Sequence, residues 1–284
     1  LMLAAAYGHR GAVDLLVQAR AQLDLVDKDG NTALIMAAAR GHVGVVKQLV
    51  DARASVTARN IDGKSALILA AAHGHVDIVE KLVTLDPLGR DAALWEAARA
   101  EEKAVLGLLL SAKVSPDVKN SQGETPLIEL AAQDRTTAVQ TLLIAKANIH
   151  ATDNRGMTAL QHALDGGHRA TARLLADTRD EHGVTALYRA VARDDVKMLG
   201  QLIKVHAALD MSAPGGFVPL MWAAAFNHLS TVEMLVEARA PLDLGDDSGY
   251  TSLMHAAAHN RSEVVRHLLN AHASVGQTAN SGVT

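Results

Sequence analysis

The residues that could do chemistry in this 284-residue chain are chiefly its 14 histidines, since cysteine is absent. His255 and His259 stand four residues apart, a spacing at which two imidazoles on one helix can hold zinc. No third histidine or carboxylate completes the set nearby, because Glu263 falls in the next expected helix. We therefore interpret the pair as surface histidines and expect no metal site.

Five other histidines recur at one position of a repeated pattern described below. A side chain at that position suits a hydrogen bond that connects two helices, so we interpret these histidines as structural. They are His9, His42, His75, His168 and His228.

No motif for catalysis or cofactor binding is found. The sequence lacks a Gly-x-Ser-x-Gly elbow, a phosphate loop and a dinucleotide fingerprint, and its glycines fall in turns. The 31 acidic residues are spread over turns and helix surfaces, and pairs such as Asp194-Asp195 and Glu101-Glu102 are interpreted as solvated connectors. We therefore predict that the chain is not an enzyme and has no catalytic residues, cofactor or metal.

Composition narrows the remaining classes. A net charge of −4 gives no basic footprint for nucleic acid. No apolar stretch is long enough for a transmembrane helix, so no membrane insertion is expected, and the apolar start at residues 1–6 is too short for a secretory signal. The lack of cysteine and of a signal favours an intracellular, cytoplasmic site.

The elements that position these residues follow from an internal repeat. Each unit has a glycine-containing turn, a Thr or Ser that can cap a helix, a short Ala-rich helix, a second amphipathic helix and an extended stretch. Equivalent leucines recur at a constant step, apart from two steps that are shorter. They are Leu1, Leu34, Leu67, Leu94, Leu127, Leu160, Leu187, Leu220 and Leu253.

The unit resembles the ankyrin repeat. Residues 120–127 follow the family pattern Asp-x-x-Gly-x-Thr-Pro-Leu closely, and Gly-His ends the first helix in four units. The resemblance implies an all-α solenoid of about nine helix-turn-helix units with β-hairpin fingers, stacked through small alanine faces. One domain over 1–284 is expected, with units starting near residues 1, 27, 60, 88, 120, 153, 180, 213 and 246.

Both ends of the sequence lie within a repeat. Residues 279–284 look like the start of a further unit, and neither end has the polar character of a capping repeat. We therefore expect a segment of a longer array, or ends that dock on further repeats or on another subunit.

Two units are six residues short, from Leu67 to Leu94 and from Leu160 to Leu187. In each, the extended stretch after the second helix is missing, so two truncated fingers and two gaps in the finger row are predicted. The gaps either admit a partner or are simple deletions, and deletion without function is the simpler interpretation.

A base replaces the glycine that the family favours at the end of the second helix. A cation near a helix C-terminus stabilises by roughly 0.3–1 kcal/mol, which offsets part of the roughly 1–2 kcal/mol cost of a left-handed non-glycine residue. Alternatively, the same residues form a basic line that meets an acidic partner. We favour the structural explanation. The residues are Arg20, Arg53, Lys113, Lys146, Arg239, His206 and His272.

The resemblance implies that finger tips and exposed positions of the first helix bind a partner protein. Transfer by position selects the following candidates: Lys28, Asp29, Asn31, Arg40, Ile61, Asp62, Lys64, His73, Asn154, Arg155, Met157, His182, Arg193, Phe217, Phe226, Tyr250 and His259.

The aromatic residues single out the last two full units, because four of the seven rings fall between Phe217 and Tyr250. Exposed rings are typical interface anchors. The alternative is local packing, in which Phe217 and Phe226 cover each other and Trp222 faces inward. We therefore predict a non-catalytic interaction scaffold. The alternatives are a regulatory or targeting region of a longer enzyme or channel chain, and a structural subunit of a large assembly.

Overall fold

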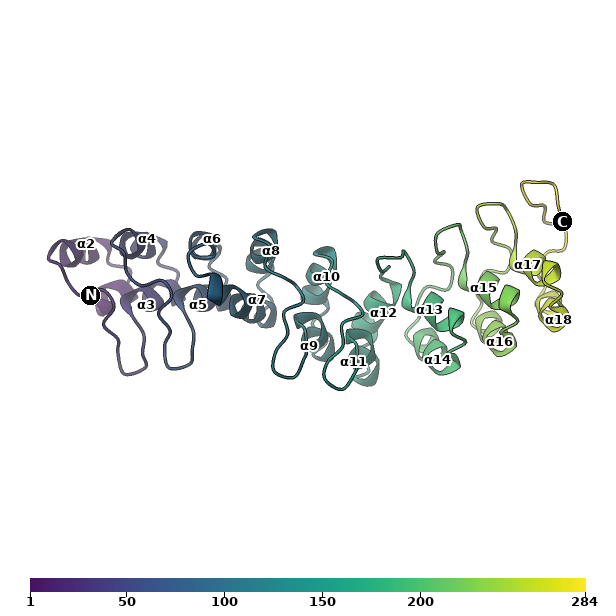
Figure 1. Ribbon diagram of the computed structural model, residues 1–284, viewed down its shortest axis with the longest axis horizontal. Helices are drawn as coiled ribbons and strands as arrows, with labels where there is room; N and C mark the ends of the chain where they lie inside the picture. Colours follow the sequence, from purple (N-terminus) through teal and green to yellow (C-terminus); the bar gives the residue numbers. More distant parts are fainter. The chain divides into compact units, whose positions relative to one another are not determined.

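The computed structural model describes all 284 residues and contains eighteen α-helices, one 3-10 helix and no strand. The chain divides into two compact units, Leu1–Thr158 and Ala159–Thr284. Within each unit the helices form consecutive antiparallel pairs, one pair per repeat (Figure 1). The predicted all-α architecture of nine helix pairs is confirmed.

The helix bounds follow the expected repeat. In the first unit the elements are α1 (Met2–Ala6), α2 (Arg10–Gln18), α3 (Ala33–Ala39), α4 (Val43–Asp51), α5 (Ala66–Ala72), α6 (Val76–Leu82), η1 (Pro87–Gly89), α7 (Arg90–Arg99), α8 (Lys103–Ser111), α9 (Pro126–Ala132) and α10 (Thr136–Ile144). In the second they are α11 (Ala159–Asp165), α12 (Arg169–Asp177), α13 (Ala186–Ala192), α14 (Val196–Lys204), α15 (Pro219–Phe226), α16 (Leu229–Glu237), α17 (Ser252–Ala258) and α18 (Ser262–Asn270).

The first helix of a repeat starts at a side-chain cap. The Ile35 amide donates to Thr32 Oγ1 at 3.2 Å, and the Tyr188 amide donates to Thr185 Oγ1 at 3.3 Å. Each cap satisfies one backbone N–H that the first helical turn leaves without a partner. The predicted caps are therefore confirmed at these helices. Val218, at the N-cap position of α15, makes no side-chain cap hydrogen bond.

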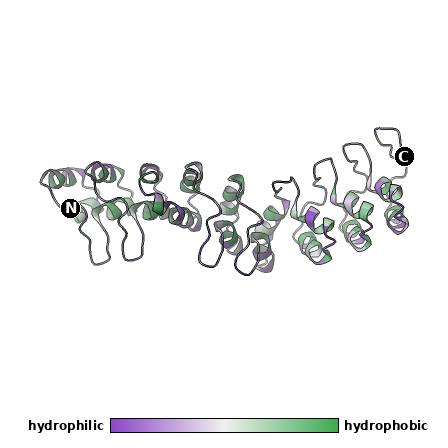
Figure 2. Cartoon of the chain, in the orientation of Figure 1, coloured by the Kyte–Doolittle hydropathy of each residue, from purple (hydrophilic) through white to green (hydrophobic).

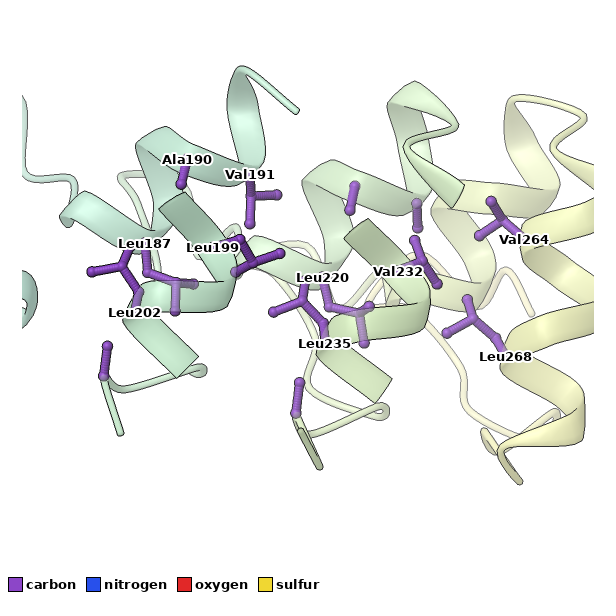
Figure 3. Packing of buried hydrophobic residues seen from close by; sticks show 14 of the residues in the cluster. Leu187, Ala190, Val191, Leu199, Leu202, Leu220, Val232, Leu235, Val264 and Leu268 are labelled. Atoms are coloured by element: carbon purple, nitrogen blue, oxygen red, sulfur yellow. The ribbon is translucent and has the colours of Figure 1, made fainter. Parts of the chain in front are cut away.

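Small and branched aliphatic side chains fill the core of each unit. Alanines of the first helices, such as Ala37, Ala38 and Ala223, are fully buried, which lets adjacent helices approach closely. In the second unit, leucines and valines of consecutive repeats interdigitate (Figure 3). Hydrophobic residues run through the helices of every repeat (Figure 2). This layered packing explains why the chain needs few aromatic residues.

The fingers are hairpin-shaped loops, and each closes in a tip turn. In the first, the Asp27 amide donates to the Asn31 carbonyl at 3.1 Å, and Gly30 takes a φ of 77°. Pairing is confined to the turn, so the arms form no strand, and one isolated bridge joins Thr152 and Thr158. The eight tip turns are 27–31, 60–64, 120–124, 153–157, 180–184, 213–217, 246–250 and 279–283.

Four pairs of neighbouring fingers are joined by backbone amides. The Ile61 amide donates to the Asp29 carbonyl at 3.0 Å, and the Asn154 amide donates to the Gln122 carbonyl at 3.0 Å. In the second unit, Asp247 and Asn280 donate in the same way to the carbonyls of Gly215 and Ser248. Nearer the helices, the amides of Ser55, Asn148, Ala208 and Ser274 donate at 2.8–2.9 Å to the carboxylates of Asp24, Asp117, Asp177 and Asp243.

The two short units differ, and the prediction that both fingers are truncated alike needs correction. Residues 83–89 form no finger, because buried Asp86 accepts hydrogen bonds from Ser65 Oγ at 2.5 Å and from the Gly89 amide at 3.0 Å and so holds η1 against the helices. The second short unit keeps its tip turn, in which the Asp180 amide donates to Val184 at 3.0 Å. Only the stretch between α12 and that turn is missing.

The basic residues that replace glycine are left-handed, as predicted, with φ values from 58° to 67°. Their backbone closes the preceding helix: the Arg53 amide donates to the Val50 carbonyl and the Ala54 amide to the Leu49 carbonyl. These bonds satisfy carbonyls that a helix end otherwise leaves unpaired. The connector between paired helices is also left-handed at Glu101, Asp134, Asp194, Asn227 and Asn260.

Candidate partner-binding surfaces

The repeated histidines link each repeat to the one before it. His42 Nε2 lies 2.9 Å from the Ala6 carbonyl oxygen, and His75 Nε2 lies 3.2 Å from that of Ala39. His228 makes the same link through Nδ1, 3.0 Å from the Val191 carbonyl. The predicted helix-connecting role is therefore confirmed for these three histidines.

His255 and His259 have different environments. His259 is exposed, and its Nδ1 lies 2.9 Å from the His255 carbonyl. The interpretation of both as surface histidines is wrong for His255, whose side chain is 12% exposed and whose Nε2 lies 3.0 Å from Asp246 Oδ2. The finger above α17 covers this ring, which explains its burial.

Asp246 is the carboxylate that this finger contributes. Burial alone would raise its pKa, but hydrogen bonds from the Tyr250 amide, from His255 and from the Ser248 amide outweigh that effect and lower the pKa below its ordinary value. Phe217 and Tyr250 pack beside His255, with ring centroids 4.8 and 5.8 Å from its own. The structure thus brings the Phe217 ring of one repeat together with the Tyr250 and His255 rings of the next.

A second group of rings lies on α13 and α15. Phe226, which is 54% exposed, stacks on Trp222 with centroids 4.4 Å apart and planes at 28°. Trp222 in turn lies 5.8 Å from Tyr188. Phe226 and Phe217 thus have partners other than each other, so the alternative interpretation, in which the two phenylalanines cover each other, is wrong. We call the six residues of these two groups the aromatic surface: Tyr188, Phe217, Trp222, Phe226, Tyr250 and His255.

Burial has consequences for two of these rings. It raises the pKa of Tyr188 to about 12. Trp222 Nε1 is buried and donates no hydrogen bond, and an unpaired buried donor costs about 1–3 kcal/mol. Trp222 is therefore not the side chain that stability alone would favour at this position.

Three candidates occupy one position in consecutive repeats of the second unit. Arg193, Phe226 and His259 follow one another one full repeat apart at the ends of α13, α15 and α17, and all three are exposed. Exposed His182 lies on a finger tip, 3.6 Å from Glu181. The aromatic surface is therefore flanked by basic side chains.

Tyr188, Trp222 and His255 were not selected as binding candidates from the sequence. A signal for two of them exists, since Trp222 and His255 stand one full repeat apart in the middle of their helices, and Arg189 precedes Trp222 by the same step. Arg189 is tied to Asp180 of its own finger in a pair where the carboxylate is fully buried. Arg189 and His255 at this position each contact a carboxylate of the finger. The residue type at this position therefore determines whether the surface beside the finger is aromatic or charged.

In two repeats of the first unit, the corresponding position carries a carboxylate that is already paired, Glu96 and Glu129. Arg99 donates to Glu129 at 2.7 Å and lies 3.7 Å from Glu96, and its guanidinium sits 5.2 Å from the centre of the Trp95 ring. The hydrogen bond to Glu129 raises the pKa of Arg99. Lys64, a finger-tip candidate, is bound to Glu96 at 3.2 Å.

The remaining candidates of the first unit are mostly exposed, and among them Ile61 and Asp29 are joined by a backbone hydrogen bond between neighbouring finger tips. Arg40 and His73 end α3 and α5, and Arg155 contacts Asp153 on its own finger at 3.2 Å. Met157 is half-buried. The basic line is exposed throughout, and none of its arginines or lysines takes part in an ion pair: Arg20, Arg53, Lys113, Lys146 and Arg239.

The sequence and the fold of this chain are both similar to those of known proteins. The family described as ankyrin repeats (3 copies) matches residues 1–91, 94–185, 128–213 and 187–279. The chain belongs to the ankyrin-repeat family. A solved structure, EF0377, an ankyrin repeat protein, is similar over 63% of this chain and 97% of that chain, with 26% identity and a TM-score of 0.57.

Two curated relatives are similar over part of the array. Potassium channel AKT2/3 of Arabidopsis thaliana is 32% identical over 35% of this chain and 17% of its own length. Probable E3 ubiquitin-protein ligase XBOS32 of Oryza sativa subsp. japonica is 29% identical over 50% of this chain and 29% of its own length. The ankyrin-repeat chain thus spans less than a third of either relative. None of its helices combines the length and the apolarity that crossing a membrane requires.

Proposed function

We propose that this ankyrin-repeat chain is a non-catalytic scaffold that binds a partner protein through its concave face and finger tips. Ankyrin repeats are generally protein-interaction modules, and the family model matches nearly the whole length of the chain. The observation that carries the proposal is the exposed Phe226 ring stacked on Trp222. An exposed ring that is held in place by a half-buried one can bury a large apolar area with little loss of side-chain entropy, which is typical of an interface anchor.

The surroundings of this pair indicate what it binds. Arg193 and His259 stand on either side of Phe226 in the adjacent repeats. The surface therefore fits a partner segment in which an apolar side chain is flanked by carboxylates. The unpaired Trp222 Nε1 supports a role beyond stability, because a leucine there would fill space without leaving a donor unsatisfied.

The test is affinity capture with the intact chain, followed by titration of the captured partner. Phe226→Ala and Tyr250→Ala are each expected to weaken binding by about 1 kcal/mol or more, roughly fivefold, while the melting temperature is unchanged. Tyr7→Ala is the matched control, because Tyr7 is an exposed ring in the first unit that stacks on His9. An unchanged affinity for the Phe226 variant would contradict the proposal.

A second candidate function is a regulatory or targeting region of a longer enzyme or channel chain, or a structural subunit of an assembly. The lengths favour it: the chain matches 17% of a potassium channel and 29% of a probable ubiquitin ligase. The full-length transcript distinguishes the two functions, since a further catalytic or membrane domain would assign the array to such a chain. An intracellular compartment stays a prediction from the lack of cysteine.

A further inference from the structure

The finger row of the first unit is interrupted at one place. Two fingers with tip turns 27–31 and 60–64 precede η1, and two with tip turns 120–124 and 153–157 follow it (Figure 1). Between them the pair α7 and α8 has no finger. We call the space between tip turns 60–64 and 120–124 the finger gap.

The backbone groups that join fingers elsewhere are unpaired on both sides of this gap. Asp62 is equivalent to Asp29, and its carbonyl accepts no hydrogen bond, whereas the carbonyl of Asp29 accepts one from Ile61. Ser121 is equivalent to Ile61, and its amide donates none. An acceptor on one wall and a donor on the other therefore mark the place of one missing turn.

The steric space for that turn is also open. A Cβ on Gly30 would lie 2.9 Å from the Ile61 amide, and one on Gly123 would lie 3.0 Å from the Asn154 amide, because the next finger packs there. Beside Gly63, which faces the gap, no atom lies within 4 Å. A neighbouring backbone therefore has room to pack against Gly63, as the next finger packs against Gly30 and Gly123.

A basic residue near the tip turn, at equivalent positions in three fingers, also bonds to backbone carbonyls. Lys119 Nζ donates to the Thr152 carbonyl of the following finger at 3.0 Å, and Arg179 bonds the Ser212 carbonyl in the same way. Arg59 has the equivalent position and binds its own tip carbonyl, that of Gly63, at 3.0 Å, as Arg179 also binds that of Gly183. No following finger offers it a carbonyl, and its second amino group lies 4.0 Å from Asp86.

The segment that takes the place of the missing finger carries two exposed leucines. Leu88 of η1 is 81% exposed, and nearby Leu85 is 42% exposed. The hydrogen bond from Ser65 to Asp86 fixes this segment at the base of the finger that carries Arg59. An exposed leucine on this segment provides a contact for an apolar side chain.

We propose that the finger gap binds one turn of a partner polypeptide. Its backbone N–H binds the Asp62 carbonyl, its backbone carbonyls bind the Ser121 amide and Arg59, and an apolar side chain packs on Leu88. Main-chain pairing of this kind is how extended segments add to an exposed edge. The gap lies in the first unit, so this site is independent of the aromatic surface and of the function proposed for it.

The probe is a ring-closed peptide of residues 148–157, the chain's own finger sequence, titrated into the isotope-labelled intact chain. We expect the Ser121 and Gly63 amide resonances to shift, and exchange of the Ser121 amide to slow. The same peptide methylated on the Asn154 nitrogen lacks the donated N–H and is the matched control. It should bind at least about fivefold more weakly.

Variants of the chain separate the gap from the rest of the finger row. Arg59→Gln and Leu88→Ser should each weaken peptide binding about fivefold. Lys119→Gln, which changes the equivalent base where a finger is already present, should leave it unchanged. Circular dichroism and the melting temperature check that each variant is folded.

Three results would overturn the proposal. The first is no shift at Ser121 and Gly63 at about 1 mM peptide. The second is equal affinity for the methylated peptide, or equal effects of Lys119→Gln and Arg59→Gln. The third is a dimer of the chain alone, seen by sedimentation and dissociated by Arg59→Gln, which would assign the gap to a second copy of the chain.

Discussion

The ring of His42 lies directly on the backbone of Gly8 in the preceding repeat. A Cβ on Gly8 would come within 2.7 Å of His42 Nδ1, while Nε2 of the same ring lies 2.9 Å from the Ala6 carbonyl. Gly41 and His75 repeat this relationship, again with 2.7 Å to the hypothetical Cβ. The glycine is therefore required twice, once by its positive φ and once by the ring of the next repeat.

This relationship predicts the effect of a methyl group at Gly8 or Gly41. Either substitution by alanine should destabilise the first unit by about 1–3 kcal/mol, from left-handed strain and from displacement of the histidine ring. Gly11→Ala is the matched control, since Gly11 lies in α2 with no atom near its Cβ position, and should stabilise by about 0.5–1 kcal/mol. Urea unfolding measures all three, and equal effects would refute the contact.

The left-handed bases predict a gain from glycine. Arg53 has a φ of 67°, so Arg53→Gly should raise the free energy of unfolding by about 1 kcal/mol. Arg40→Gly is the control, because Arg40 has a φ of −101° and gains nothing from glycine. Thermal and denaturant unfolding give the two differences.

The same bases allow a test of the basic line. Because the structural explanation is favoured, reversing Arg53 and Arg239 to Glu should leave affinity for a captured partner unchanged. A loss of binding at low salt that disappears at high salt would instead support contact with an acidic partner.

Asp246 predicts a loss of stability in acid. Its pKa in the folded chain is lowered, mainly because the Tyr250 amide and His255 outweigh burial, so its contribution is fully present above the unfolded pKa of about 3.9. That contribution is lost as the pH falls through the lowered folded value. Asp246→Asn should therefore be less stable than the native chain at pH 6 and approach its stability as the pH falls through the lowered folded pKa of Asp246.

The measurement is urea unfolding of the intact chain across that pH range. Asp247→Asn, an exposed change on the same finger tip, serves as the control and should follow the native profile. A constant difference between the Asp246 variant and the native chain at all pH values would show that the ionised carboxylate is not the cause.

Tyr188 predicts the opposite behaviour in alkali. Burial raises the pKa of its phenol to about 12, so the neutral form is favoured on folding. The stability contribution is complete below the unfolded value of about 10 and is lost as the pH rises toward about 12. Tyr188→Phe should reduce the alkaline loss of stability, whereas Tyr7→Phe, at an exposed ring, should not.

Local rules account for most of what the sequence predicts correctly. The caps at Thr32 and Thr185, the left-handed Arg53 and the histidine links all depend on a few adjacent residues or on the neighbouring repeat. They recur with the repeat itself, so a pattern in the sequence is enough to locate them.

The parts that failed depend on contacts across loops. His255 is buried because a finger carboxylate reaches it. The stack of Phe226 on Trp222 is an exception, because these residues lie four apart on α15 and their spacing alone could have indicated the contact. The two short units contain the same deletion length, yet the buried hydrogen bonds of Asp86 decide that one of them has no tip turn. Such choices follow from tertiary packing that no periodicity encodes.

The amides that join neighbouring fingers all donate from the later repeat to the earlier one, as Ile61 does to Asp29 and Ser274 to Asp243. The stack is therefore a one-way structure with distinguishable faces. A cut between two fingers joined in this way would leave the acceptors of these amides on the upstream fragment and the donating amides on the downstream fragment. Such fragments can rejoin head to tail but have no matching way to pair head to head, which makes the order of repeats along the chain a physical property of their interfaces.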